Sequence, residues 1–148
     1  MSNFSNRRFQ KKLNILTISI GLIYFYFGLL KFFPSISPAE SIGISTVCKL
    51  CFGLLSPKVS IFLLALLEVS IGICLITRIY LKVAVTIAII HLTMTFTPFL
   101  LFPEQAFQGS LISPSLLGQY IFKNIIIISA LLVIYPGKND SVALDGSN

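Results

Sequence analysis

One apolar run, from Val59 to Thr77, restricts the fold of this chain more than any other stretch, because its only charged residue, Glu68, stands near its centre. A helix needs about 20 mostly apolar residues to cross a bilayer, and this run is long enough. A carboxylate at the centre of a bilayer costs ~2.5–3.5 kcal/mol on insertion scales and usually faces other helices, where a partner is found. The run therefore predicts a bundle of membrane helices that contains a cation for Glu68.

The overall composition is typical of a membrane protein. Of the 148 residues, 55% are hydrophobic and only 11% are charged, whereas soluble domains carry about 25% charged residues. The length allows one domain. A formal net charge of +6 is also found in nucleic-acid-binding proteins, but here the basic residues flank apolar runs. We interpret them as charges that set membrane topology, and expect the lipid bilayer rather than nucleic acid as the partner.

Four apolar runs predict an all-α fold with four transmembrane helices, at about 13–33, 57–77, 80–100 and 115–135. The basic segment 1–12 resembles the start of a signal peptide. However, the run after it exceeds the ~7–15 residues of a signal-peptide core and no A-x-A cleavage site follows, so we expect an uncleaved first span. The domain is predicted over 13–135, with a disordered polar tail over 136–148.

The connectors carry helix-start signals. Ser37-Pro38-Ala39-Glu40 has the N-cap, the proline at the first helical position and the glutamate of a capping box. It predicts a short helix from Pro38 to about Phe52 that caps the bundle between spans one and two. Ser56-Pro57 and Ser113-Pro114 are expected to open spans two and four by the same logic, and Pro98 to end or kink span three.

The distribution of basic residues predicts the orientation in the membrane. The positive-inside rule is satisfied when both termini are cytoplasmic. Only Lys49 and Lys58 then lie on the outer side, and the connectors with the capping helix are external. The cytoplasmic set is Arg7, Arg8, Lys11, Lys12, Arg78, Lys82 and Lys138. We expect a multi-pass protein of the plasma membrane, the inner membrane of a bacterium.

Ionisable residues in the spans fall at similar depths. At 1.5 Å per residue, Glu68 lies ~16 Å below the start of span two, Lys123 ~13 Å below the start of span four, and His91 ~10 Å below Pro98. Lys31 is near the outer end of span one. These four side chains are expected to form one polar cluster beneath the external connectors. Secondary candidates, on the same helix faces or in the basic turn after span two, are Tyr24, Thr95, Gln119 and Arg78.

Several motifs together resemble the DoxX-like family of small integral membrane proteins. They are G-L-L-K-F-F-P at 28–34, Glu68-x-x-x-Gly72 before a basic turn, T-F-T-P-F-L-L-F-P-E at 95–104, and G-Q-Y-I-F-K-N at 118–124. The resemblance covers 13–135 and implies a four-helix membrane bundle. Members are linked to quinone-dependent thiosulfate oxidation, to oxidative-stress resistance and, in distant animal relatives, to receptor assembly. The positions that carry over are Lys31, Glu68, Arg78 and Lys123, without an agreed catalytic role.

The cluster suggests a redox function and two alternatives. A carboxylate beside an amine could bind and protonate a quinone head group, as in a redox accessory subunit of a membrane or periplasmic oxidoreductase. The alternatives are a non-catalytic scaffold or assembly factor, in which the buried pair fixes helix register, and a path for small-molecule permeation. His91 could relay protons or only bond two helices. A lone histidine makes a poor metal site, so no metal is expected.

Two cysteines form a C-x-x-C on the predicted outer side, Cys48 and Cys51. Disulfides form in such compartments, so the pair could be a redox dithiol; the alternative is a chance spacing within a helix. Cys74, deep in span two, is expected only to pack. Both aspartates lie in the tail, at Asp140 and Asp145, so a hydrolytic triad is not expected within the spans.

Overall fold

The regular structure of this protein is helical. The computed structural model describes residues 2–33, 40–107 and 115–135, and its elements within these ranges are all helices, as predicted. They are α1 (Ser2–Leu30), α2 (Glu40–Leu50), α3 (Pro57–Thr77), α4 (Leu81–Met94), α5 (Pro98–Leu101), α6 (Pro103–Ala106) and α7 (Leu116–Ile134). The expected cap at Ser37-Pro38, the start at Ser113-Pro114 and the tail 136–148 lie outside the described residues.

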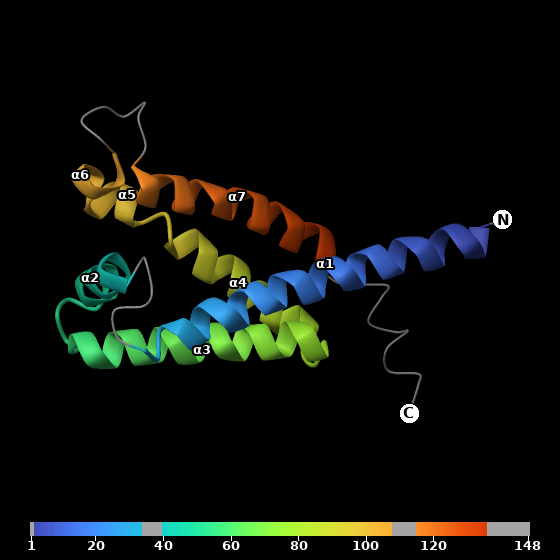
Figure 1. The fold of residues 1–148 in the computed structure, drawn as a ribbon, viewed down its shortest axis with the longest axis horizontal. Helices are drawn as coiled ribbons and strands as arrows, with labels where there is room; N and C mark the ends of the chain where they lie inside the picture. The colour runs from blue at the N-terminus through green and yellow to red at the C-terminus, as the bar shows by residue number, and fades with distance from the viewer. Residues whose placement is uncertain (1, 34–39, 108–114, 136–148) are drawn as a thin grey trace.

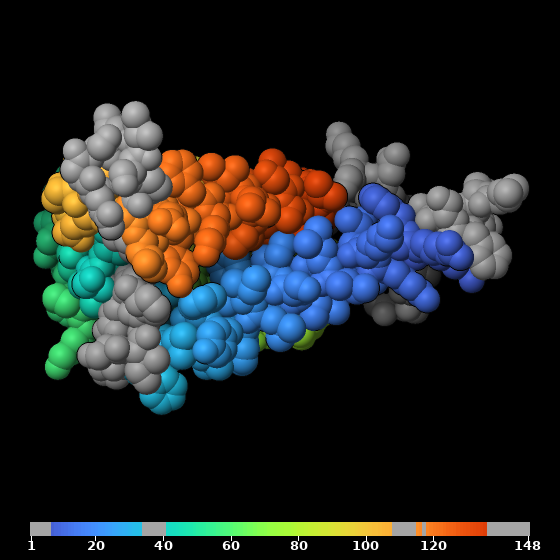
Figure 2. Space-filling model, turned by 45° about the horizontal axis from the view of Figure 1, so that its top comes forward, coloured from blue at the N-terminus to red at the C-terminus, as the bar shows by residue number. Residues whose placement is uncertain are grey.

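The four long helices α1, α3, α4 and α7 contact one another in a closed ring, and the most extensive contact joins α1 to α3 (Figure 1). The short helices α2, α5 and α6 gather at one end of this bundle. The turn between α3 and α4 lies at the opposite end, where α1 projects beyond its neighbours. We call these the α2 end and the turn end. Figure 2 shows α1 and α7 side by side along one face.

Three helical stretches are long and apolar enough to cross a membrane. They are Arg7–Leu30, Pro57–Thr77 and Leu81–Leu101, the last of which includes the break between α4 and α5. The apolar stretch of α7, Gly118–Ile134, is shorter. Large apolar side chains such as Leu22, Phe62 and Ile126 are exposed on the outside of the bundle, as expected for helices that face lipid rather than water.

The second span begins and ends where the sequence predicts. The Ser56 hydroxyl accepts a hydrogen bond from the backbone N–H of Val59 at 3.4 Å, and Pro57 occupies the first turn of α3. The first span differs from the prediction, because α1 begins at Ser2 and ends at Leu30. The basic segment 1–12 therefore continues the helix, and no structural boundary separates it from the span.

The predicted third span departs from its expected end, whereas α7 agrees with the predicted 115–135 to within one residue at each end. Helix α4 stops at Met94, ahead of Pro98, and Pro98 opens α5 instead. Pro98 has no backbone N–H to continue the helical ladder, and over 95–97 the backbone bonds shorten to the i→i−3 type, as in Thr97 N–H to the Met94 carbonyl at 3.1 Å. For α7 the N-cap is Ser115, whose hydroxyl accepts from the N–H of Gly118 at 3.1 Å.

Glycines bring the backbones of α1 and α3 into direct contact. A Cβ added at Gly72 would lie 2.6 Å from the backbone nitrogen of Phe25, and one at Gly28 would lie 2.8 Å from that of Val69. Such small residues let membrane helices pack closely where apolar burial offers little driving force. The α1–α3 contact thus depends on the absence of side chains at these two positions.

The apolar core lies toward the turn end. Its buried members come from all four long helices and include Ile20, Ile71, Leu75, Val85, Leu131 and Ile134. Between α3 and α4 the chain reverses through Arg78 and Tyr80, which adopt left-handed backbone with φ of 62° and 52°. This short reversal packs α4 against α3. Residues of the two helices that lie between the core and the α2 end therefore face each other.

We predict that Gly72→Ala destabilises the bundle. The added methyl group would meet the backbone of Phe25, which cannot move as a flexible side chain can, and overpacking of this kind costs ~1–3 kcal/mol. The measurement is the free energy of unfolding in mixed detergent micelles titrated with a denaturing detergent. The control is Gly43→Ala, whose added Cβ would meet only Leu64 Cδ2 at 3.5 Å; it should match or exceed the wild type, because alanine favours helix by ~1 kcal/mol. Equal loss in both variants would contradict the packing argument.

Candidate functional site

An ion pair joins α1 to α3 in the apolar part of the bundle. The Nζ of Lys31 donates to Oε2 of Glu68 at 2.5 Å, and each of the two side chains is only 10% exposed. Lys31 follows the last residue of α1, so its amine also reaches back to the carbonyl oxygen of Phe27 at 3.5 Å. The pairing of Glu68 with an amine of span one, predicted from the cost of a lone carboxylate in lipid, is present.

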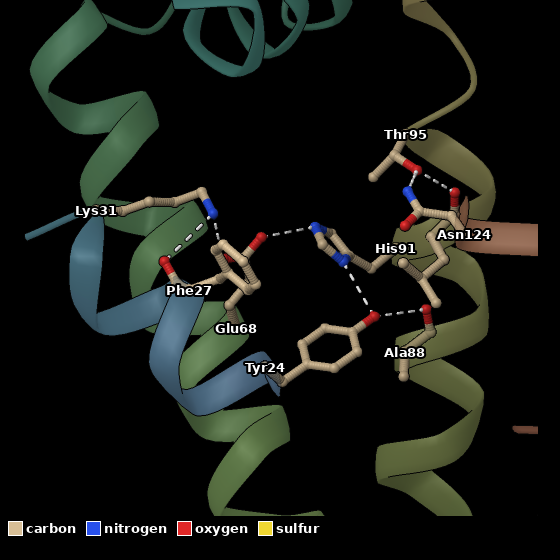
Figure 3. A network of polar contacts seen from close by, with 9 residues as sticks. Tyr24, Phe27, Lys31, Glu68, Ala88, His91, Thr95 and Asn124 are labelled. Atoms are coloured by element: carbon tan, nitrogen blue, oxygen red, sulfur yellow. Dashed lines mark hydrogen bonds and ion pairs between the residues drawn. The ribbon is translucent and has the colours of Figure 1, made fainter. Parts of the chain in front are cut away.

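The ion pair continues into α4 through the single histidine of the chain (Figure 3). The Nε2 of His91 lies 3.5 Å from Oε1 of Glu68. On its other side, Nδ1 lies 3.3 Å from the hydroxyl of Tyr24, which in turn donates to the carbonyl oxygen of Ala88 at 3.1 Å. Lys31, Glu68, His91 and Tyr24 thus form one continuous chain of polar contacts, which we call the network.

The hydrogens of the network limit its protonation states. A phenol has one hydrogen, and the Tyr24 hydroxyl has two acceptors within reach, the Ala88 carbonyl and Nδ1 of His91. When Tyr24 donates to Ala88, Nδ1–H of His91 donates to Tyr24. Nε2 and Glu68 then need a proton between them, on the imidazole or on the carboxyl group. The imidazole and the carboxyl group, 3.5 Å apart, are thus the two places in the network that can hold this proton.

Two members of the predicted site, Lys123 and Gln119, lie elsewhere. Both are exposed on α7, and the Lys123 amine lies 4.8 Å from the centre of the Tyr120 ring. The helix presents the neighbouring Asn124 to the bundle instead, since adjacent residues differ by about 100° around a helix. Among the described residues the cations and acids pair as Lys31–Glu68 and His91–Glu68, so the expectation that Lys123 neutralises Glu68 is corrected.

Asn124 is the polar residue of α7 that the sequence interpretation missed. Its Nδ2 donates to the hydroxyl of Thr95 at 2.7 Å, and that hydroxyl donates to the carbonyl oxygen of Leu92. Thr95 therefore connects the end of α4 to α7 beside the network rather than joining it (Figure 3). The sequence signal for Asn124 was an amide within an apolar run, but the neighbouring charge of Lys123 was the stronger signal.

The remaining candidates stand apart from the network. Arg78 is exposed in the α3–α4 turn, ~15 Å along α3 from Glu68 at 1.5 Å per residue. Cys48 and Cys51 are unbonded to each other, and the Cys48 sulfur lies 3.5 Å from both the Leu55 carbonyl and the Ser60 hydroxyl. Cys74 is half-buried on α3. No group of three metal-ligating side chains occurs within the described residues.

Comparison of the chain with family models, with curated proteins and with solved structures returned no match.

We predict that Lys31 and Glu68 are energetically coupled. Removing one partner of a buried pair leaves the other charge uncompensated, at ~3–5 kcal/mol when fully buried, although a lysine at a helix end recovers part of that cost by snorkelling. Lys31→Met and Glu68→Gln should each lower the free energy of unfolding, and the double variant should lose ~0.5–3 kcal/mol less than their sum. Lys123→Met is the matched control and should stay near wild type. Additive losses would show that the two residues do not interact.

Proposed function

We propose that this chain is a DoxX-like membrane protein whose network binds the polar head group of a quinone, as an accessory subunit of a membrane oxidoreductase. The observation that supports this is the continuous contact chain from Lys31 through Glu68 and His91 to Tyr24. It places an amine, a carboxylate, an imidazole and a phenol between apolar helices. The family assignment rests on the sequence resemblance alone.

The groups of the network match what a quinone needs. A quinone carbonyl accepts hydrogen bonds, and its reduction to the hydroquinone takes up two electrons and two protons. An ammonium group has three hydrogens, and within the described part of the chain the Lys31 amine contacts Glu68 Oε2 and the Phe27 carbonyl, which leaves one hydrogen for a ligand. Glu68 and His91 can supply one proton at a time, so the second proton would be taken up from the aqueous phase after the first is delivered, and the two electrons would come from the partner oxidoreductase.

The network remains within reach of a ligand. Lys31 and Glu68 are each 10% exposed and His91 is 11% exposed, so the three side chains are not sealed in the core. The side chains of Phe32 and Phe62 stack edge to face near the end of α1, with ring centres 5.7 Å apart.

A non-catalytic scaffold is the second candidate, and a specific observation favours it. The Lys31–Glu68 pair lies one helical turn from Gly28 and Gly72, where the α1 and α3 backbones touch. A buried pair at such a contact can fix helix register without any chemistry. On this view His91 and Tyr24 only add a link to α4.

We also propose a topology of four spans with both termini cytoplasmic in the plasma membrane. Helix α7, with its shorter apolar stretch, would be the fourth span. Helix α2 would cap the outer side, since Arg78 and Lys82 mark the cytoplasmic turn. Reporter domains fused to the two termini should both read as cytoplasmic, and one inserted at Gly53, in the α2–α3 connector, as external. Termini on opposite sides would mean that α7 does not cross.

The test of the quinone proposal is ligand content at equal folded yield. Wild-type protein purified from membranes in mild detergent should retain a quinone, and Glu68→Gln should reduce the retained amount at least tenfold, because the variant loses both the ion pair and the proton store. Lys123→Gln removes an exposed amine at another place and should retain as much as wild type. Quinone that is absent from wild type, or equal in all three proteins, would leave the scaffold as the function.

A further inference from the structure

Buried polar and apolar side chains separate along the long axis of the bundle. On the turn-end side of the network the buried side chains of the long helices are apolar. We call the following six the plug: Ile20, Ile71, Leu75, Val85, Leu131 and Ile134. In the described residues on that side, the buried polar residue is Thr17, whose hydroxyl is bonded to the Leu13 carbonyl of its own helix at 2.8 Å.

The opposite side of the network holds several buried polar groups among apolar residues such as Ile42 and Ile121. Lys31 lies just beyond the end of α1 and is the network member nearest the α2 end. Toward that end follow the Asn124–Thr95 hydrogen bond and the buried hydroxyl of Ser60, which contacts Cys48. Thr46 of α2 is also buried there, and its hydroxyl has no partner among the described residues. Apart from Thr17, the buried hydroxyl and amide groups of the described residues thus lie on the α2-end side of the network.

We propose that the network exchanges protons with the aqueous phase at the α2 end and is closed to the turn end by the plug. Tyr24, the last network residue toward the turn end, lies seven residues and ~10 Å along α1 from Lys31. Beyond it, α3 continues for nine residues past Glu68, ~13 Å of apolar packing. An excess proton has no partner in such a layer, where an unpaired charge is very costly.

The titratable groups that face His91 come from three helices. They are Tyr24 and Lys31 of α1 and Glu68 of α3, with His91 itself on α4. Helix α7 faces this region through Asn124, which does not titrate, and its Lys123 points outward over Tyr120. Among the residues that the structure describes, the proton reservoir is therefore the network, and its opening lies at the Lys31 side.

The biological role of this one-sided proton exchange rests on the proposed function, but the experiment that tests it does not. At a quinone site, it means that substrate protons enter and leave at the α2 end, which the basic residues place outside the cell. It also excludes a through path for protons, and so separates the quinone and scaffold functions from permeation.

The single histidine of the chain makes the test direct. Protein labelled only at histidine with ¹⁵N is reconstituted in one orientation into vesicles whose inner and outer pH are set independently, over a range that extends well below the one in which free imidazoles titrate. The His91 imidazole signals should shift when the pH at the α2 end changes and stay fixed when only the pH at the turn end changes. A proton ionophore that equalises the two sides should give the full shift from either side.

Signals that follow the pH at the turn end, at both ends or at neither end would overturn the proposal. No quinone is needed in this measurement, so its outcome is independent of the quinone-retention test. Quinone bound by a network that titrates from both sides would contradict only the plug. A one-sided titration in protein that retains no quinone would contradict only the proposed function.

A variant of the plug adds a second readout. Leu75→Asn places an amide at a position with 0% exposure and should let His91 respond to both sides, with proton leakage into dye-loaded vesicles at least tenfold above wild type. Ser70→Asn is the matched control on the same helix, at an exposed position, and should behave as wild type. Wild-type vesicles that leak protons faster than protein-free vesicles would overturn the plug even if Leu75→Asn does not fold.

Discussion

The contact between Lys31 and Glu68 is the interaction on which the rest of this structure depends. An acid at the middle of an apolar helix requires a cation, and Lys31 can supply it only if α1 and α3 approach closely. Gly28 and Gly72 make that approach possible, each one helical turn from a member of the pair. A Cβ at Gly28 would lie 3.0 Å from the Cβ of Glu68 itself. The close backbone contact and the ion pair therefore depend on the same glycine.

The two proposed functions use this arrangement differently. A scaffold in which the buried pair fixes the register of α1 and α3 needs the ion pair and the glycines. It gains little from a phenol and an imidazole. The extension through His91 to Tyr24 adds groups that store and pass a proton, which is the feature that favours redox chemistry. The Asn124–Thr95 bond, by contrast, ties α7 to α4 with no titratable group, as a structural contact would.

Much of the fold follows from local sequence signals, and the site follows only in part. The apolar run with Ser56-Pro57 at its start defines α3 because a cap, a proline and a hydrophobic stretch agree. The Lys31–Glu68 pair was predictable because a lone acid in an apolar helix needs a cation from another helix, and the apolar runs contain few cations. The choice between Lys31 and Lys123 was not predictable, because both were expected toward the outer side of the bundle, and only the rotation of α7 about its axis shows that Lys123 points away from Glu68. That rotation depends on the packing of the whole bundle. Because α7 is apolar almost all round, the periodicity of its sequence is a weak indication of which face is buried.

The continuation of α1 through Leu30 has a consequence for biosynthesis. Lys31 is translated before Glu68, and the glycine-lined face of α1 is already complete when α3 emerges. Glu68 can therefore enter the lipid next to the ammonium group of Lys31, which is already in place, rather than as an unpaired charge. His91 joins afterwards, so its imidazole is added to a pair of helices in which Lys31 and Glu68 already neutralise each other.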